Sequence, residues 1–156
     1  MAKCGLALNI AKCEFGQPTV TFLRHQVTAG GIAPLAAKVT AITSLHRPST
    51  VKELLRYLGM VNYYCRFLPA AARVLKPLNN ALRSLPQWQQ ALDWTDSMQE
   101  SFDSSKQLLL AAIPLAHPDP AAGIVVAADA SDTHIGGVLQ QRDTRGWRPL
   151  GFSAGN

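Results

Sequence analysis

One stretch of the sequence indicates the fold more clearly than any other: Thr50-Val-Lys-Glu-Leu-Leu-Arg-Tyr-Leu-Gly-Met-Val-Asn-Tyr-Tyr-Cys-Arg-Phe-Leu-Pro69. It opens with the capping-box pattern, in which Thr50 and Glu53 satisfy each other's free backbone amides at the start of a helix. Apolar residues then recur at helical spacing, at Val51, Leu54, Leu55, Leu58 and Val61. The pattern predicts an amphipathic helix that buries this stripe and is ended by Pro69.

The opposite face of the predicted helix is basic and contains a glycine. Its residues are spaced four, three, four and three apart, so they share one side: Lys52, Arg56, Gly59, Tyr63 and Arg66. A glycine on an exposed helix face costs about 1 kcal/mol relative to alanine, so something should compensate for it. A nucleic-acid groove fits, with cations on phosphates and with Asn62 and Tyr63 near sugars or base edges. The alternative is that Gly59 admits a neighbouring helix of the same protein.

The charge of the chain is concentrated around this helix. The whole sequence has 156 residues and a net charge of +5, but residues 36–85 hold eight basic residues and one acidic residue, whereas residues 86–156 carry −4. A basic block beside less basic segments favours a polyanion-binding surface. The alternative is a charged surface that only confers solubility. With 47% hydrophobic and 16% charged residues, the chain is not a disordered tail.

Composition also limits the compartment and excludes some site types. No apolar run approaches the ~20 residues of a membrane span, and the N-terminus lacks a signal peptide's apolar region. The three cysteines form no Cys-x-x-Cys pair, and the histidines show no metal spacing, which argues against a disulfide framework or a zinc site. We therefore expect no membrane partner and an intracellular, reducing location that is otherwise unknown.

The flanking segments predict an α+β fold. The first third favours strands: 19–27, with 12–15 as its hairpin partner and a short edge strand near Ile32. Further helices are expected over 35–45, over 71–82 and from an N-cap at Thr95. The tail predicts three strands, 124–129, 136–141 and 148–152.

An ordered series of motifs now resembles the reverse transcriptases of gypsy-type LTR retrotransposons. The segment from Tyr57 to Pro69 is similar to their Phe-Leu-Gly-x-x-Asn-Tyr-Tyr-Arg-Arg-Phe-Ile-Pro signature. Further matches follow the same order along the chain: Leu8-Asn9, Lys12-Cys13, Phe22-Leu23-Arg24-His25, Gly31-Ile32-Ala33-Pro34, Lys38-Val39, Pro77-Leu78, Trp94-Thr95, Lys106, Ala128-Asp129-Ala130-Ser131 and Gly136-Gly137-Val138-Leu139-Gln140. The resemblance spans residues 6–153.

The resemblance implies an order of parts. Residues 1–34 would be the last strands of a polymerase palm, 35–90 the helical thumb, 91–120 a connecting helix and linker, and 121–156 the start of a truncated ribonuclease H-like domain with an incomplete three-stranded sheet. In such enzymes a thumb helix lies in the minor groove of the template–primer duplex, which agrees with the basic face. Phe22, Leu23 and His25 are similar to the primer grip, although Phe22 has the alternative of a core aromatic.

The resemblance also implies which chemistry is missing. The polymerase needs an Asp-Asp pair that holds magnesium, and this sequence contains none. Asp129 matches the first metal-binding carboxylate of ribonuclease H, but its glutamate partner would follow Asn156. Mg²⁺ is expected in the intact family enzyme and not tightly bound here, so the chain is expected to be a fragment that is inactive alone. Without further strands, an apolar sheet face that includes Val126 and Val138 would be exposed unless the thumb covers it.

Two positions depart from the family pattern. Arg24 replaces the usual glycine of Phe-Leu-Gly-His, and Cys65 replaces an arginine.

The favoured function is a partial reverse transcriptase/ribonuclease H that binds an RNA–DNA or DNA duplex, with the missing polyprotein segments as further partners. One rival is a domesticated protein-interaction module whose Gly59 face receives a partner helix. Another is a residual ribonuclease that depends on Asp129. The oligomeric state is not predicted.

Overall fold

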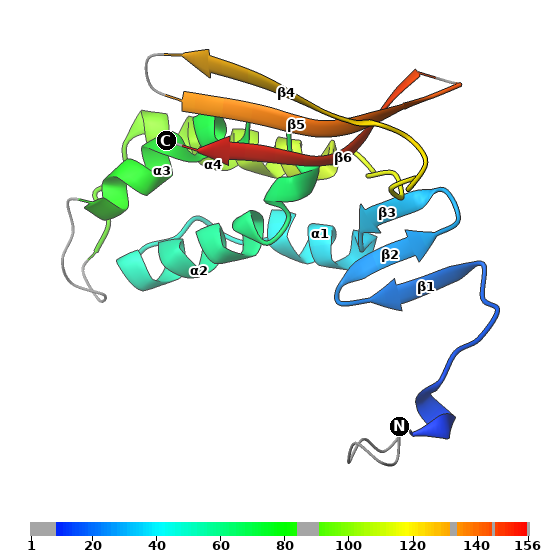
Figure 1. Ribbon diagram of the computed structural model, residues 1–156. Helices are drawn as coiled ribbons and strands as arrows, with labels where there is room; N and C mark the ends of the chain where they lie inside the picture. The colour runs from blue at the N-terminus through cyan, green and yellow to red at the C-terminus, as the bar shows by residue number, and fades with distance from the viewer. Residues whose placement is uncertain (1–8, 84–90, 132–133, 145, 156) are drawn as a thin grey trace, which may run out of the picture.

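The computed structural model describes residues 9–83, 91–131, 134–144 and 146–155. Within these ranges a layer of helices is flanked by two three-stranded antiparallel sheets, β1-β2-β3 and β4-β5-β6 (Figure 1). This confirms the predicted α+β class. The helices are α1 (Ala36–Thr43), α2 (Val51–Asn62), α3 (Ala71–Arg83) and α4 (Asp96–Leu110). The strands are β1 (Thr19–Phe22), β2 (His25–Thr28), β3 (Gly31–Pro34), β4 (Ile124–Ser131), β5 (His134–Asp143) and β6 (Gly146–Gly155).

The first sheet differs from the prediction in two ways. The expected strand over 19–27 is split into β1 and β2, because Leu23 and Arg24 adopt φ values of 46° and 63° and turn the chain back on itself. Positive φ at both central residues is typical of the type I′ hairpin turn, whose twist matches that of paired strands. The expected partner over 12–15 is also wrong, since the Asn9 side chain caps a 3₁₀ turn at Ile10–Lys12. The edge strand near Ile32 is confirmed as β3.

A single core holds the four helices together. It contains side chains from every helix, and its most buried members include Leu54, Val61, Leu78 and Leu109. One assignment in the predicted stripe of α2 is wrong: Leu55 is 37% exposed, and Tyr57 takes the inward position at 2%. The Tyr57 hydroxyl lies 2.6 Å from Ser105 Oγ of α4, so this buried polar group has a partner.

The start of α2 agrees with the sequence, but its end does not. Thr50 Oγ1 accepts from the Glu53 amide at 3.3 Å, as predicted. The Glu53 carboxylate bonds one residue further back than expected, to the backbone N–H of Ser49 at 2.7 Å and to its hydroxyl at 2.9 Å. The helix ends at Asn62 rather than near Pro69, because a 3₁₀ turn at Cys65–Phe67 follows and buries Phe67.

One glycine fixes the first sheet to the segment that follows α4. Ile32 and Leu115 exchange backbone hydrogen bonds, each of 2.8 Å. At Gly31, φ is +147° and an added Cβ would lie 2.2 Å from the Leu115 carbonyl oxygen. Only glycine permits so close an approach with this backbone conformation. The hairpin is therefore held in place by backbone contacts far along the chain.

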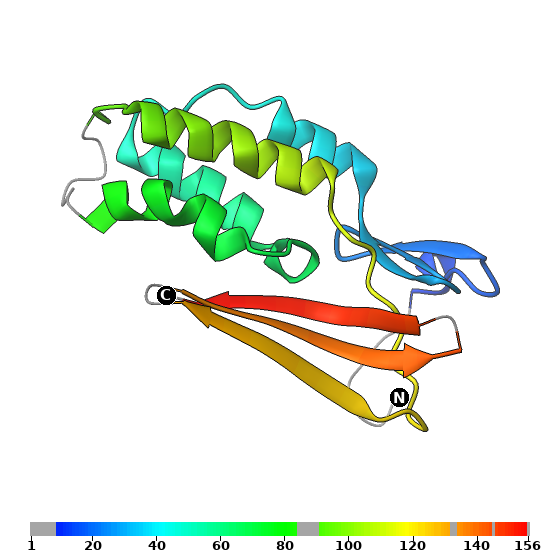
Figure 2. The same ribbon diagram turned by 90° about the horizontal axis from the view of Figure 1, so that it is seen from above.

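The second sheet meets the helical layer mainly through its β6 side, and β5 also contacts α3. Strand β6 faces the helical layer and β4 is the most distant strand (Figure 2). Leu150 of β6 is 8% exposed, and Phe152 packs against the helical core. The expectation of an uncovered apolar face holds for Val126, which is 68% exposed, whereas Val138 is half-buried. The three tail strands are confirmed and are longer than predicted.

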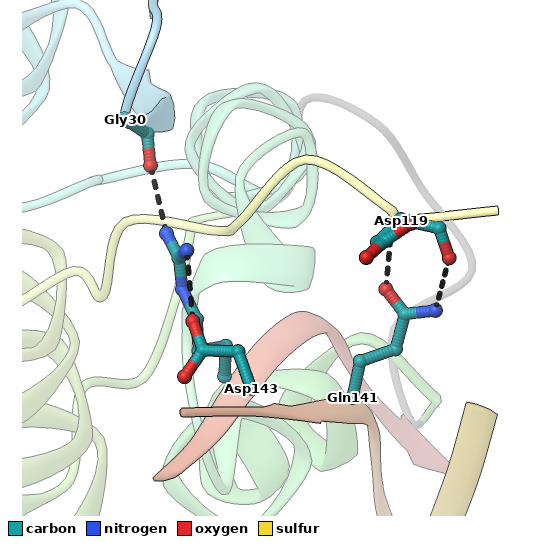
Figure 3. A network of polar contacts seen from close by, with 5 residues as sticks. Gly30, Asp119, Gln141 and Asp143 are labelled. Atoms are coloured by element: carbon teal, nitrogen blue, oxygen red, sulfur yellow. Dashed lines mark hydrogen bonds and ion pairs between the residues drawn. The ribbon is translucent and has the colours of Figure 1, made fainter. Parts of the chain in front are cut away.

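Polar contacts fasten this sheet to the linker and to the hairpin (Figure 3). The buried Gln141 side chain accepts from the Asp119 amide and donates to the Asp119 carbonyl, both at 2.9 Å. Arg148 donates to the Gly30 carbonyl at 3.1 Å and forms an ion pair with Asp143 at 3.2 Å.

The fold positions the second sheet on the α3 side, so the outer face of α2 stays clear of it (Figure 1). None of the described helices is long and apolar enough to cross a membrane.

Candidate nucleic-acid interface

The outer face of α2 is exposed, as the sequence predicts. Lys52, Arg56, Gly59, Asn62 and Tyr63 are all solvent-exposed. A Cβ built on Gly59 meets nothing within 4 Å among the described residues. No helix among the described residues therefore approaches Gly59, contrary to the interpretation that this glycine admits a neighbouring helix. Neither basic side chain of this face forms an ion pair within the described part of the chain, so both cations are available to an external anion.

The C-terminal end of the predicted basic face does not continue the helix, in contrast to the prediction. Arg66 lies on the 3₁₀ turn after α2, and its guanidinium carbon is 5.5 Å from the centroid of the Phe67 ring. Asn62 Oδ1 accepts from the Cys65 thiol at 3.3 Å. Burial raises the pKa of that thiol, so Cys65 stays protonated and donates. Arg66 is therefore exposed next to the helix rather than on its last turn.

The turn between β1 and β2 lies against the end of α2. The Tyr63 hydroxyl donates to the Leu23 carbonyl, and the Tyr64 hydroxyl donates to the Arg24 carbonyl at 3.4 Å. Tyr64 is buried, and burial raises the pKa of its hydroxyl, which keeps the proton that makes this bond. Two tyrosines of the Asn-Tyr-Tyr motif thus hold both left-handed residues of the turn.

His25, which follows the turn, packs against the aromatic side chains at the end of α2. Its ring stacks on Tyr63 with centroids 5.3 Å apart and an interplanar angle of 24°, and it also meets Phe67 at 5.3 Å. Its Nε2 is buried without a hydrogen-bond partner among the described residues. Phe22 and Leu23 instead project from the turn at 62% and 67% exposure. The alternative of Phe22 as a core aromatic is therefore wrong.

A concave site lies where α1, α2 and this turn meet. The cavity has a volume of about 360 Å³, at the small end of the range for small-molecule sites, and Gly59 is among the residues that line it. Three cations from three elements line it: Arg24, Lys38 and Arg56. Its apolar lining comes from Ile42, Leu45 and Met60, and no carboxylate lines it. Such a surface attracts anions, because its described lining has three positive charges and no carboxylate.

Asp129 is remote from this basic region. It is exposed on β4, where its backbone pairs with Gly136 of β5. No group of three or more His, Cys, Asp or Glu side chains among the described residues is arranged to hold a metal ion. A site for two hard cations needs several oxygen ligands, so Asp129 with its described surroundings does not fit such a site.

Sequence reasoning missed two members of the basic region. Arg24 is visible only as an arginine in place of a family glycine, and Lys38 only as one residue of a motif. Their proximity to Arg56 depends on how the hairpin and α1 pack against α2, which helical spacing does not encode. The exposed tyrosine and the glycine, by contrast, followed from spacing alone.

Comparison with known protein families gives a match for the C-terminal part of the chain. Residues 94–155 match the family model of the RNase H-like domain found in reverse transcriptase. This range covers α4 and all of the second sheet.

The sequence relatives are polyproteins of retrotransposons. The chain is 32% identical over 153 residues to the Transposon Tf2-3 polyprotein and to the Transposon Tf2-4 polyprotein of Schizosaccharomyces pombe. The match covers 97% of this chain and 11% of each relative. The chain is therefore similar to transposon polyproteins, in agreement with the resemblance of its motifs, and it spans about a tenth of their length.

Solved structures show the same fold. The foamy viral protease-reverse transcriptase in complex with dsDNA matches with a TM-score of 0.78 and 23% identity, over 88% of this chain and 28% of that one. The structure of that protein in complex with RNA/DNA hybrid gives 0.76 and 24%, over 89% of this chain and 18% of that one. The arrangement of helices between two sheets is thus that of a known reverse transcriptase.

Proposed function

We propose that this chain binds nucleic-acid duplexes, RNA–DNA or DNA, through the outer face of α2. The observation that carries the proposal is the exposed row of Lys52, Arg56 and Tyr63 around an open Gly59, with its cations unpaired among the described residues. The glycine leaves room for a duplex backbone against the helix, and both cations precede that space along the helix.

The β1–β2 turn supports the proposal from a second direction. Phe22 and Leu23 are exposed at its tip, and Tyr63 of α2 holds the Leu23 carbonyl. A strand lying on the α2 face would meet the turn, where apolar side chains can contact a sugar or a base. We assign to this turn the primer-grip-like role of Phe22, Leu23 and His25, with His25 packed beneath and the other two facing the ligand.

The relatives make the proposal specific. The foamy viral protein is seen in complex with dsDNA and with RNA/DNA hybrid. Because this chain has that fold, a duplex is the polyanion we expect it to recognise. The contact is electrostatic, so about three phosphates should give a slope of about −3 for log affinity against log salt.

Titration of a labelled RNA–DNA hybrid at two salt concentrations tests the proposal. Affinity should fall roughly 40-fold between about 50 and 200 mM salt. Replacing Lys52, Arg56 and Arg66 together by alanine should remove most of the binding and flatten the salt slope, since each lost phosphate contact lowers it by about 1. The single Arg66→Ala variant should lose only part of the affinity for the hybrid. This measures what an arginine on the turn after α2 contributes.

A second triple variant on another helix serves as the matched control. Arg73→Ala, Lys76→Ala and Arg83→Ala remove the same charge from α3. If only net charge matters, both triples will weaken binding equally, and the α2 face is not the site. Wild-type protein that does not bind at low salt, or binds without salt dependence, would reject the function itself. A monodisperse homodimer without nucleic-acid affinity would favour the protein-interaction module.

We also propose that the chain alone neither binds Mg²⁺ tightly nor cleaves a hybrid. We assign to Asp129 the role of an orphaned first carboxylate, because it is exposed and belongs to no group of three or more potential metal ligands among the described residues. A hybrid incubated with about 10 mM Mg²⁺ should stay intact for wild type and for Asp129→Asn alike. Cleavage by the wild type that is abolished in Asp129→Asn would establish the residual ribonuclease instead.

A further inference from the structure

We propose that the cavity between α1, α2 and the β1–β2 turn binds a single unpaired nucleotide, with its phosphate at the basic rim and its base against the apolar lining. This inference rests on the proposed function only in that the α2 face delivers a strand to the cavity. It adds a second binding site, different in chemistry from a duplex-binding face.

The volume and its origin support a ligand of this size. The cavity measures about 360 Å³, at the small end of the range for small-molecule sites. Small residues from two helices line it, Gly59 on α2 and Ala41 on α1, and an added Cβ at Gly59 would meet nothing within 4 Å among the described residues. A base pair held in a duplex cannot enter such a space. One base that has left the stack can.

The lining divides into two chemical halves. Arg24, Lys38 and Arg56 supply positive charge from three separate elements, without a carboxylate among the lining residues. Ile42, Leu45 and Met60 supply an apolar surface, and the ring of Tyr63, 42% exposed, borders it. A flat base with a phosphate satisfies both halves, whereas inorganic phosphate would leave the apolar half unused.

Arg24 is placed at the rim at some cost to the backbone. Its φ of 63° is a left-handed conformation that glycine adopts far more readily. The Tyr64 hydroxyl holds its carbonyl, and its guanidinium carbon lies 5.8 Å from the centroid of the Tyr63 ring. The strained residue thus carries a cation close to Tyr63, one of the two tyrosines that line the cavity. This gives the unusual side chain a function at this position.

The test compares a blunt duplex with the same duplex carrying a short unpaired extension. Wild-type protein should bind the extended duplex about five- to tenfold more tightly, because an unpaired base gains a surface on which to pack. Ala41→Phe fills the cavity from an exposed position. It should abolish this preference and leave blunt-duplex affinity within about twofold. Ala36→Phe makes the same change on α1 at an exposed residue outside the lining, and it should keep the preference.

Further arms separate the possible outcomes. Lys38→Gln should reduce the preference for the extended duplex without filling the cavity. If the Ala41→Phe protein does not fold, the Lys38→Gln variant still tests the site. Free deoxyadenosine monophosphate that competes fully with the extension would support the site and assign it to free nucleotides. Equal binding of both duplexes by wild type, or a preference that survives Ala41→Phe, would overturn the site. Wild-type protein that does not bind the blunt duplex but does bind the isolated single-stranded extension would reject the proposed duplex binding and leave the nucleotide site standing.

Discussion

The outer face of α2 and strand β4 are both open to solvent, but only one of them has a supporting structure around it. Behind α2 lies a closed core, with Leu54 and Val61 fully buried. Beside it, the hairpin turn and α1 add cations to a concave surface. Strand β4 pairs with β5 along one edge only, and its residues from Ile124 to Ala130 are exposed. Exposure alone therefore does not define a site, and converging elements do.

The largest expected effect separates the two regions by stability. Leu54→Ala should destabilise the protein by about 2–5 kcal/mol, because it leaves a cavity beneath α2. Val126→Ala on β4 should change stability by less than about 0.5 kcal/mol, since its side chain is 68% exposed. Urea denaturation of both variants measures the contrast. Similar losses in the two would mean that β4 is covered in solution.

A smaller effect measures how firmly α2 is anchored. Tyr57→Phe removes the buried hydroxyl that meets Ser105, while the Ser105 hydroxyl keeps its bond to the Phe102 carbonyl at 2.7 Å. The loss of one buried hydrogen bond should cost about 1 kcal/mol. Comparing Tyr57→Phe, Ser105→Ala and the double variant in thermal unfolding isolates the pair. Additive losses would show that the two hydroxyls do not interact.

Arg24→Gly should separate stability from binding. Glycine relieves the left-handed backbone at this position, which should stabilise the fold by up to about 1 kcal/mol, partly offset by the greater freedom of the unfolded chain. The same change removes a rim cation and should weaken binding of the extended duplex. Both quantities are measurable on one preparation. A variant that is less stable than wild type would contradict the account of strain.

The smallest effect concerns pH at the start of α2. The Ser49 backbone N–H and hydroxyl lower the pKa of the Glu53 carboxyl. A lowered folded-state pKa adds stability above the unfolded-state pKa, and this is lost as pH falls through the folded value. Between about pH 7 and pH 3 the wild type should therefore lose slightly more stability than Glu53→Gln. Identical pH profiles would show that the cap contributes nothing through its charge.

Local sequence patterns predicted most of the elements and part of the site. The capping residues Thr50 and Thr95, the exposed glycine face and the three tail strands all followed from short-range patterns. The split of the first strand did not, because Leu23 and Arg24 are not residues that favour a positive φ. The placement of Arg66 failed for a related reason: the helix gives way to a 3₁₀ turn that buries Phe67.

By itself the sequence determined the helix of Thr50 to Asn62, its basic face, and the kinship with retrotransposon polyproteins, since these depend on residue type and spacing along the chain. Only the tertiary structure brought Arg24, Lys38 and Arg56 to one cavity. It also left Asp129 exposed on β4, in no group of three or more potential metal ligands among the described residues. The physical reason is that side chains distant in sequence meet only when hydrophobic burial packs their elements together.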